Sequence, residues 1–127
     1  MIKSDPSTWA DQRHRDGEAA ERRAADLLIA DGYAIIEQRY RFHHHDVDLI
    51  ARRGNVVVFV EVRSRRSARF GKAIETVRSG KQRDLVRAAS SWLQRHGRPG
   101  DVARFDVVAI QAGRMEWVQS AFRPLWR

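Results

Sequence analysis

Residues 46–63 read DVDLIARRGNVVVFVEVR and decide the fold, because two runs of strand-forming residues flank a turn signal. If Gly54 and Asn55 form a two-residue turn with glycine at its first central position, Arg53 pairs with Val56. The stretch therefore predicts an antiparallel β-hairpin.

This register determines which polar side chains face one another. It sets Asp48 opposite Glu61 and Asp46 opposite Arg63. A different turn, in which the numbers of paired residues add up to two less, would instead set Asp46 opposite Glu61. Side chains alternate along a strand, so either register puts these four residues on one face. The other face is predicted to hold the apolar residues Val47, Leu49, Val58, Val60 and Val62.

Two carboxylates that face each other across a ladder repel, so an apolar hairpin that places them there sacrifices stability unless a cation joins them. Magnesium prefers oxygen ligands and is typically held by one or two carboxylates together with substrate phosphates. The pair Asp48 and Glu61 therefore favours a Mg²⁺ or Mn²⁺ site for phosphodiester chemistry. The alternative leaves Asp48 in solvent and pairs Glu61 with an arginine.

The sequence also resembles a known family through residues 45–51, HDVDLIA, and residues 58–65, VFVEVRSR. Both segments are similar to the YraN-like family of predicted nucleases, whose core resembles the restriction-endonuclease fold. The likeness extends from about residue 16 to residue 122. It includes GEAA at residues 17–20, Gly32-Tyr33, Lys81 and RFDVV at residues 104–108.

The resemblance implies a hairpin that binds Mg²⁺ and cleaves nucleic acid through an aspartate followed by an acid, one residue and a lysine. Asp48 and Glu61 match the two acids and would hold the metal with the Val62 carbonyl. Asp46 would be an outer-shell or second-metal ligand. The family also implies that Glu18, on the first helix, approaches the metal edge of the sheet; the alternative is an ion pair with Arg22 on the helix surface.

Two positions depart from the family pattern. Asp46 stands where the family typically has glutamate, and Arg63 stands where it has lysine. Arginine stays charged, so Arg63 would stabilise the phosphate but would not take a proton from water. Three outcomes stay open: the metal alone acidifies the water, Lys81 or Lys72 supplies the ammonium, or catalysis has been lost.

The net charge of +8 makes nucleic acid, and DNA first, the expected partner. The basic residues expected to contact phosphate run outward from the hairpin and into the second helix. They are Arg63, Arg65, Arg66, Arg69, Lys72 and Lys81. On the second helix, Arg83 and Arg87 form either a solvated face or a track for a nucleic-acid backbone.

Length and composition predict a single domain over residues 1–127, with residues 1–8 as a flexible arm. The absence of cysteine excludes disulfides and thiol catalysis and fits a cytoplasmic location. Neither a signal peptide nor a membrane span is expected. A homodimer is compatible with the sequence but nothing in it demands one.

The expected elements are a helix over residues 9–30, a strand over 33–41, the hairpin, a helix from Ser79 to near Gly97, a strand over 105–110 and a further strand over 115–118. This order, αβββαβ with a possible last strand, predicts an α/β restriction-endonuclease-like domain with a mixed sheet flanked by helices. Consecutive histidines His43, His44 and His45 point alternately to opposite faces, so they are not expected to form one metal site. Asp106 is expected to pair with an arginine across the sheet.

These observations favour a metal-dependent endonuclease acting on DNA or structured nucleic acid. Two alternatives remain: a catalytically inactive nucleic-acid-binding module, and a protein-interaction domain with a basic face.

Overall fold

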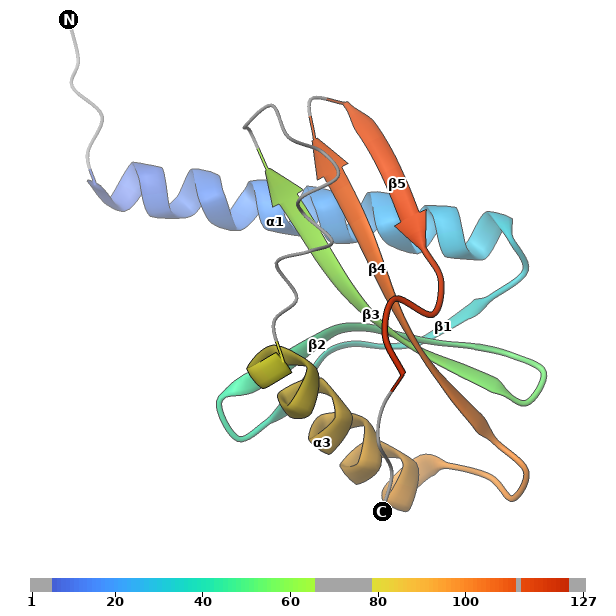
Figure 1. Cartoon of the computed structure of the whole chain (residues 1–127). Coiled ribbons are helices and arrows are strands. Elements are labelled where there is room, and N and C mark those ends of the chain that lie inside the picture. The colour runs from blue at the N-terminus through green and yellow to red at the C-terminus, as the bar shows by residue number, and fades with distance from the viewer. Residues whose placement is uncertain (1–5, 66–78, 112, 124–127) are drawn as a thin grey trace, which may run out of the picture.

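The computed structural model describes residues 6–65, 79–111 and 113–123. They form an α/β domain in the order αβββαββ (Figure 1). Its elements are α1 (Pro6–Ala30), β1 (Ala34–Phe42), β2 (His45–Arg53), β3 (Val56–Arg65), α3 (Ser79–His96), β4 (Val102–Gln111) and β5 (Arg114–Val118).

The five strands form one mixed sheet in the order β1-β2-β3-β4-β5. Only β3 and β4 are parallel, because the chain returns through α3 before β4 begins. The helices lie on opposite faces of the sheet (Figure 1). The mixed α/β arrangement predicted from the order of elements is therefore confirmed.

The hairpin register is also confirmed. Gly54 has a φ of 62°, in the left-handed region that glycine adopts readily, and Arg53 pairs with Val56. Successive pairs continue to Leu49 and Val60, where the regular ladder between β2 and β3 ends. The next residues along the two strands are Asp48 and Glu61, so the acids lie where the ladder stops.

Two apolar clusters cover the faces of the sheet. One packs α1 against the sheet through Ala24 and Leu28, with Leu49 and Val60 beneath them. The other packs α3 through Trp92, which contacts Phe59 edge-on at a centroid distance of 6.0 Å. Burial on both faces excludes water from the central strands and fixes which residues of β3 face each helix.

One expectation about the faces is wrong. Val47 was expected beside Leu49, yet Leu49 packs in the α1 cluster and Val47 in the α3 cluster. The neighbouring strand is irregular beside these residues, because Arg39 has a φ of 53°. Arg39 lies between the pairs Gln38 with Leu49 and Tyr40 with Val47.

Some predicted boundaries also shift. Helix α1 begins at Pro6, so residues 6–8 belong to the helix rather than to an N-terminal arm. Residues 1–5 of the expected arm lie outside the described residues. Strand β4 extends beyond the expected residues 105–110 at both ends. None of the helices in the described part of the chain has the length and apolar composition needed to cross a membrane.

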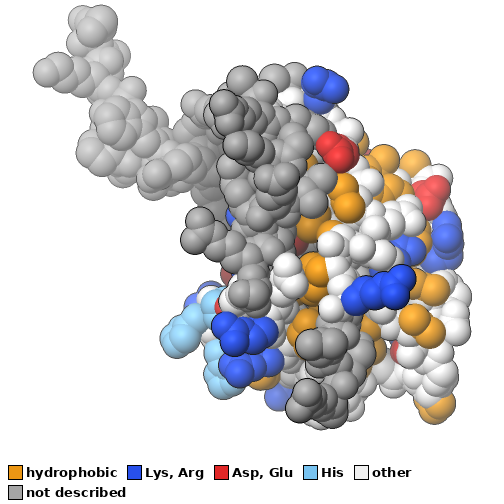
Figure 2. Space-filling view, in the orientation of Figure 1, with side chains coloured by type: hydrophobic (Ala, Val, Ile, Leu, Met, Phe, Trp, Pro, Cys, Tyr) orange, Lys and Arg blue, Asp and Glu red, His pale blue; other side chains and the backbone are white. Residues whose placement is uncertain are grey.

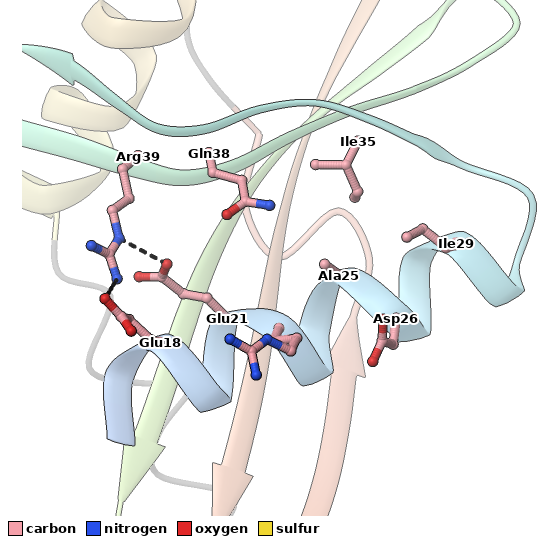
Figure 3. A pocket seen from close by; sticks show the side chains of 9 residues that line it. Glu18, Glu21, Ala25, Asp26, Ile29, Ile35, Gln38 and Arg39 are labelled. Carbon is pink, nitrogen blue, oxygen red and sulfur yellow. Dashed lines mark hydrogen bonds and ion pairs between the residues drawn. The ribbon is translucent and has the colours of Figure 1, made fainter. Parts of the chain in front are cut away.

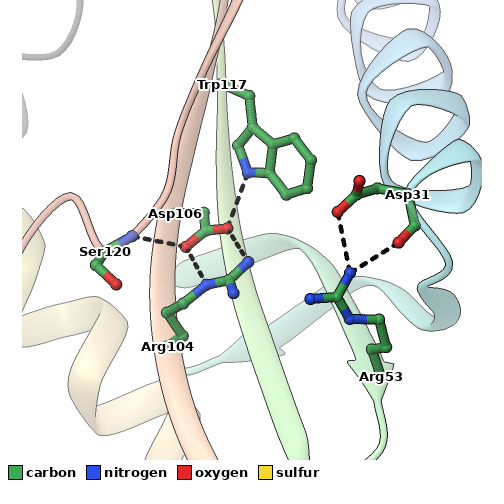
Figure 4. Close-up of polar contacts among 6 residues, drawn as sticks. All are labelled: Asp31, Arg53, Arg104, Asp106, Trp117 and Ser120. Carbon is green, nitrogen blue, oxygen red and sulfur yellow. Dashed lines mark hydrogen bonds and ion pairs between the residues drawn. The ribbon is translucent and has the colours of Figure 1, made fainter.

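Buried Asp106 joins β4 to β5 (Figure 4). Its carboxylate accepts hydrogen bonds from Arg104 at 2.7 and 2.9 Å, from Trp117 Nε1 at 2.8 Å and from the Ser120 amide at 3.0 Å. The predicted arginine partner is present, but it lies on the same strand rather than across the sheet. Because each contact satisfies a buried carboxylate oxygen, this network is structural.

Candidate metal and phosphate site

The carboxylate of Asp48 is fixed by the backbone of the adjacent strand. Its Oδ2 accepts a hydrogen bond of 2.7 Å from the amide of Val62. This amide lies on β3 just past the last regular pair, Leu49 with Val60. The side chain of Asp48 thus satisfies a backbone donor beyond the end of the ladder, which holds the carboxylate beside β3.

Glu61 is buried, with only 9% of its side chain exposed, and two cations approach the same oxygen. Lys81 Nζ lies 3.7 Å from Oε1, and Arg63 Nε lies 3.3 Å from it. The Arg63 contact is an ion pair without hydrogen-bond geometry, because Nε has no hydrogen-bond partner among the described residues. The other oxygen, Oε2, is buried and also has no hydrogen-bond partner in this part of the chain.

Burial disfavours the charged form of both acids. Desolvation, followed by the charge of Glu61, raises the pKa of Asp48 to about 7. Desolvation also raises the pKa of Glu61, although the charges of Lys81 and Arg63 oppose this change. A pair of carboxyls with raised pKa values in a buried position is typical of functional sites.

Lys81 reaches the acids from the first turn of α3, on the face of the sheet where Phe59 and Trp92 pack. Glu61 follows Phe59 by two residues on β3, so alternation turns its carboxylate toward α3. The structure thus brings Asp48, Glu61, Arg63 and Lys81 together, as expected. Nothing local in the sequence fixes this contact between Lys81 and Glu61, because 19 residues separate them along the chain and the sheet closes the gap.

A groove of about 410 Å³ lies between β1 and α1 (Figure 3). In it, Arg39 Nε donates a 3.0 Å hydrogen bond to Glu21 Oε2, and Arg39 also lies 3.8 Å from Glu18 Oε1. Glu18 therefore pairs with an arginine of β1 rather than with Arg22, the partner considered for it on the helix.

Sequence reasoning missed two residues here, Glu21 and Arg39. The negative charge of Glu21 contributes to the raised pKa of Asp48, and Asp48 contributes to the raised pKa of Arg39. Charged groups in the groove, Glu21 and Arg39, therefore interact electrostatically with Asp48 of the acid pair. The spacing of Glu21, three residues after Glu18, was a usable signal because both positions lie on one side of a helix.

Asp46 and the histidines do not join the acid pair. Asp46 Oδ1 lies 3.8 Å from Arg41 of β1, and these two residues are paired across the strands. His45 Nε2 lies 3.1 Å from Asp84 Oδ2 of α3. Within the described residues, no three histidine, cysteine, aspartate or glutamate side chains converge as a metal-ligating group.

The donor set still fits a hard divalent cation. Asp48 and Glu61 offer carboxylate oxygens. Oε2 of Glu61, which accepts no hydrogen bond from the described residues, is a buried acceptor that a cation would satisfy. A site with two protein carboxylates is sufficient for Mg²⁺, which keeps several waters and binds phosphate oxygens of a substrate. Asp46 would require a change in its contact with Arg41 to take part.

Of the remaining residues predicted to contact phosphate, the structure describes one. Arg65 is the last residue of β3, where it pairs with Gln111 of the parallel strand β4. Arg66, Arg69 and Lys72 lie outside the described residues. Their expected contact with nucleic acid remains a prediction.

A mixed α/β sheet with an acid pair on a central hairpin is the arrangement expected of a restriction-endonuclease-like domain. The sequence profile of the "Uncharacterised protein family UPF0102" matches residues 20–110. The chain belongs to this family, which is the YraN family.

Relatives from several bacteria match over most of their length. The UPF0102 protein STH1475 of Symbiobacterium thermophilum is 46% identical over 85% of this chain and 96% of the relative. The UPF0102 protein BAV3162 of Bordetella avium is 40% identical over 98% of this chain and 81% of the relative. The UPF0102 protein RSc3265 of Ralstonia nicotianae is 47% identical over 84% of this chain and 85% of the relative.

Proposed function

We propose that this chain is a Mg²⁺- or Mn²⁺-dependent endonuclease that hydrolyses phosphodiester bonds in DNA or structured nucleic acid. The observation that carries the proposal is the buried pair Asp48 and Glu61, in which Oε2 of Glu61 has no hydrogen-bond partner within residues 6–65, 79–111 and 113–123. Burying two adjacent carboxyls and leaving an oxygen unsatisfied costs stability, and a cation shared by both would offset this cost.

Asp48 and Glu61 would hold the ion. A bound divalent cation lowers the pKa of water and polarises phosphate oxygens. The Val62 amide keeps the Asp48 carboxylate in one orientation, because it donates a hydrogen bond to Oδ2. The other carboxylate oxygen would then be available to the ion. Preorganisation of this kind is favourable because the carboxylate need not be ordered when substrate arrives.

Lys81 and Arg63 would act on the phosphate. Both are cationic groups within 4 Å of Glu61 Oε1, so a phosphate bound at the acid pair would lie near two positive charges. Arg63 remains protonated and would donate hydrogen bonds to the charge that develops on phosphorus oxygens. Lys81 is the lysine that supplies an ammonium in place of the one that the family carries at the position of Arg63.

A catalytically silent nucleic-acid-binding module is the second candidate, and the two ion pairs of Glu61 favour it. Lys81 and Arg63 both approach Glu61 Oε1, so the chain already provides two cations for a single carboxylate. If these charges neutralise Glu61 fully, the site would need no metal. Binding would then persist without cleavage.

Cleavage assays with labelled single-stranded, duplex, flap and four-way-junction DNA in Mn²⁺ would separate the candidates. The parent is compared with Asp48→Asn and Arg63→Lys, purified in the same way to exclude contaminating nuclease. Metal-dependent cleavage that Asp48→Asn abolishes supports the endonuclease. Cleavage that survives this change or needs no metal contradicts it, and binding without cleavage by the parent and by Arg63→Lys supports the silent module.

A further inference from the structure

A tight hairpin turn joins β1 to β2. Phe42 pairs with His45, so His43 and His44 are the two central residues of this turn. His43 has a φ of 57°, which two-residue hairpin turns require at their first central residue. Both histidines are exposed, so the turn presents two imidazole groups to solvent.

Two contacts fix the end of this hairpin against α3. His45 Nε2 lies 3.1 Å from Asp84 Oδ2, and Tyr40 forms a hydrogen bond of 2.9 Å with Ser91. Asp84, Arg87 and Ser91 follow one another at spacings of three and four residues, so they lie along one side of the helix. Arg87 therefore lies beside the hairpin, between two residues that contact it.

Exposed cations gather at this junction. Arg83 and Arg87 lie one helical turn apart and are exposed, and neither forms an ion pair within the part of the chain that the structure describes. Arg41, on the hairpin, has a side chain that is 67% exposed. Figure 2 shows histidine side chains beside lysine and arginine side chains at the lower left of the molecule, where the β1–β2 turn and α3 lie in Figure 1.

We infer that this basic junction, defined as Arg41, His43, His44, Arg83 and Arg87, binds the phosphate backbone of duplex nucleic acid beside the acid pair. The inference rests on the proposed function. Lys81, which contacts Glu61, precedes Asp84 by three residues on α3, so the contact between His45 and Asp84 lies about one helical turn from the candidate site. The junction consists of other residues than the basic segment after β3 that the sequence alone favoured.

The chemistry of the junction favours a duplex over a single strand. Proteins that bind single strands present exposed aromatic rings on which bases stack. Phe42 is the last residue of β1, and its ring packs edge-on against His43 at 4.3 Å and against the α3 cluster, so it is not free to stack on a base. The arginine guanidinium groups of the junction suit phosphate contacts, which position a duplex without reading its sequence.

The test measures binding without cleavage. Every protein carries Asp48→Asn, the buffer contains EDTA, and the affinity for a labelled 20-base-pair duplex is measured over a range of salt concentrations. Arg83→Gln with Arg87→Gln should lower the magnitude of the slope of log K against log salt by about 2, because each lost phosphate contact removes about 0.9. Arg22→Gln, an exposed change on α1 at the opposite face, should leave the slope unchanged.

His43→Gly serves as the second variant, because glycine suits the left-handed backbone and should leave the fold intact while removing the imidazole. It should weaken duplex binding severalfold. An unchanged slope in the double arginine variant, tighter binding of a single strand than of the duplex, or displacement of the duplex by polyglutamate at equal charge would overturn the inference.

The outcome is distinguishable from failure of the proposed function. If the protein with Asp48 intact cuts DNA in Mn²⁺ while the arginine variants bind like the parent, the junction is rejected and the nuclease stands. If the variants lose binding as expected but the intact protein cuts no substrate, the junction stands and the nuclease is rejected.

Discussion

The Val62 amide donates a 2.7 Å hydrogen bond to Oδ2 of Asp48, so a side chain occupies the position of a ladder partner where β2 and β3 cease to pair. This contact ties the proposed metal ligand to the strand that carries Glu61. It also explains why two acids remain adjacent in a buried position, because one carboxylate is satisfied partly by backbone. The stability of the folded chain should therefore respond to the charge of Asp48.

Asp48→Asn should stabilise the protein at pH 8 and have little effect near pH 4. The pKa of Asp48 is about 7 in the folded chain against an ordinary value of 3.8, so the folded state keeps the proton longer than the unfolded state. Its contribution to the free energy of unfolding is most favourable below pH 4, falls as pH rises from about 4 to 7, and stays low above that. Asparagine can still accept from Val62 and removes the charge.

The gain at pH 8 should be roughly 2–4 kcal/mol in the free energy of unfolding, since each unit of pKa shift corresponds to about 1.4 kcal/mol. Urea unfolding at pH 4, 6 and 8 measures it. Equal stability of parent and variant at pH 8 would show that Asp48 is not penalised for its charge in the folded protein.

Mn²⁺ should raise the melting temperature of the parent at pH 8 by several degrees. A ligand at 100 times its dissociation constant adds about 2.7 kcal/mol to the stability of the state that binds it. Thermal unfolding in Mn²⁺ and in EDTA measures the shift. Asp48→Asn should lose the shift, whereas Asp31→Asn, at an exposed acid paired with Arg53, should keep it; a shift of equal size in all three proteins would indicate binding elsewhere.

Lys81→Met should slow cleavage by about 100-fold or more, the loss typical when a group that stabilises transition-state charge is removed. It also removes the strongest influence that lowers the pKa of Glu61, so this ligand becomes harder to ionise. Lys81→Arg should retain more activity because it keeps the charge. Single-turnover rates give the comparison, with Arg95→Met in the last turn of α3 as the control; if Lys81→Met cuts at the parental rate, Lys81 has no part in the reaction.

Arg39→Gly should be more stable than Arg39→Ala by about 1 kcal/mol, because both lose the ion pairs with α1 but only glycine relieves the positive φ. The same exchange at exposed Gln38, whose φ is not positive, should have the opposite sign. Thermal unfolding of the four variants measures both differences. A more stable alanine at residue 39 would mean that this strand break is not a strained conformation.

Asp106→Ala should cost roughly 3–5 kcal/mol in the free energy of unfolding, since it leaves Arg104, Trp117 and the Ser120 amide without their shared acceptor. Asp31→Ala, which breaks the more exposed pair with Arg53 shown in Figure 4, should cost under about 1 kcal/mol. Chemical denaturation distinguishes the two. Similar losses at both positions would show that burial does not set the strength of these pairs.

The sequence by itself determined the hairpin, its register and the order of elements. These features are local: glycine at position 54 sets the turn, the turn sets the pairing of Arg53 with Val56, and regular pairs continue to Leu49 and Val60, directly before the two acids. The apolar residues of α3 likewise recur every three to four positions, the repeat of a helix face, and Trp92 on this face is buried.

Only the tertiary structure decided how the site is completed. The left-handed backbone of Arg39 opposes the preference of a non-glycine residue, and its contacts with Glu18 and Glu21 come from a separate helix. Val47 packs in the α3 cluster although Leu49 packs in the α1 cluster, and Asp46 pairs with Arg41 beyond the last regular pair of β2 and β3. Lys81 meets Glu61 because α3 packs on the sheet. Such contacts depend on long-range packing, which local sequence rules do not specify.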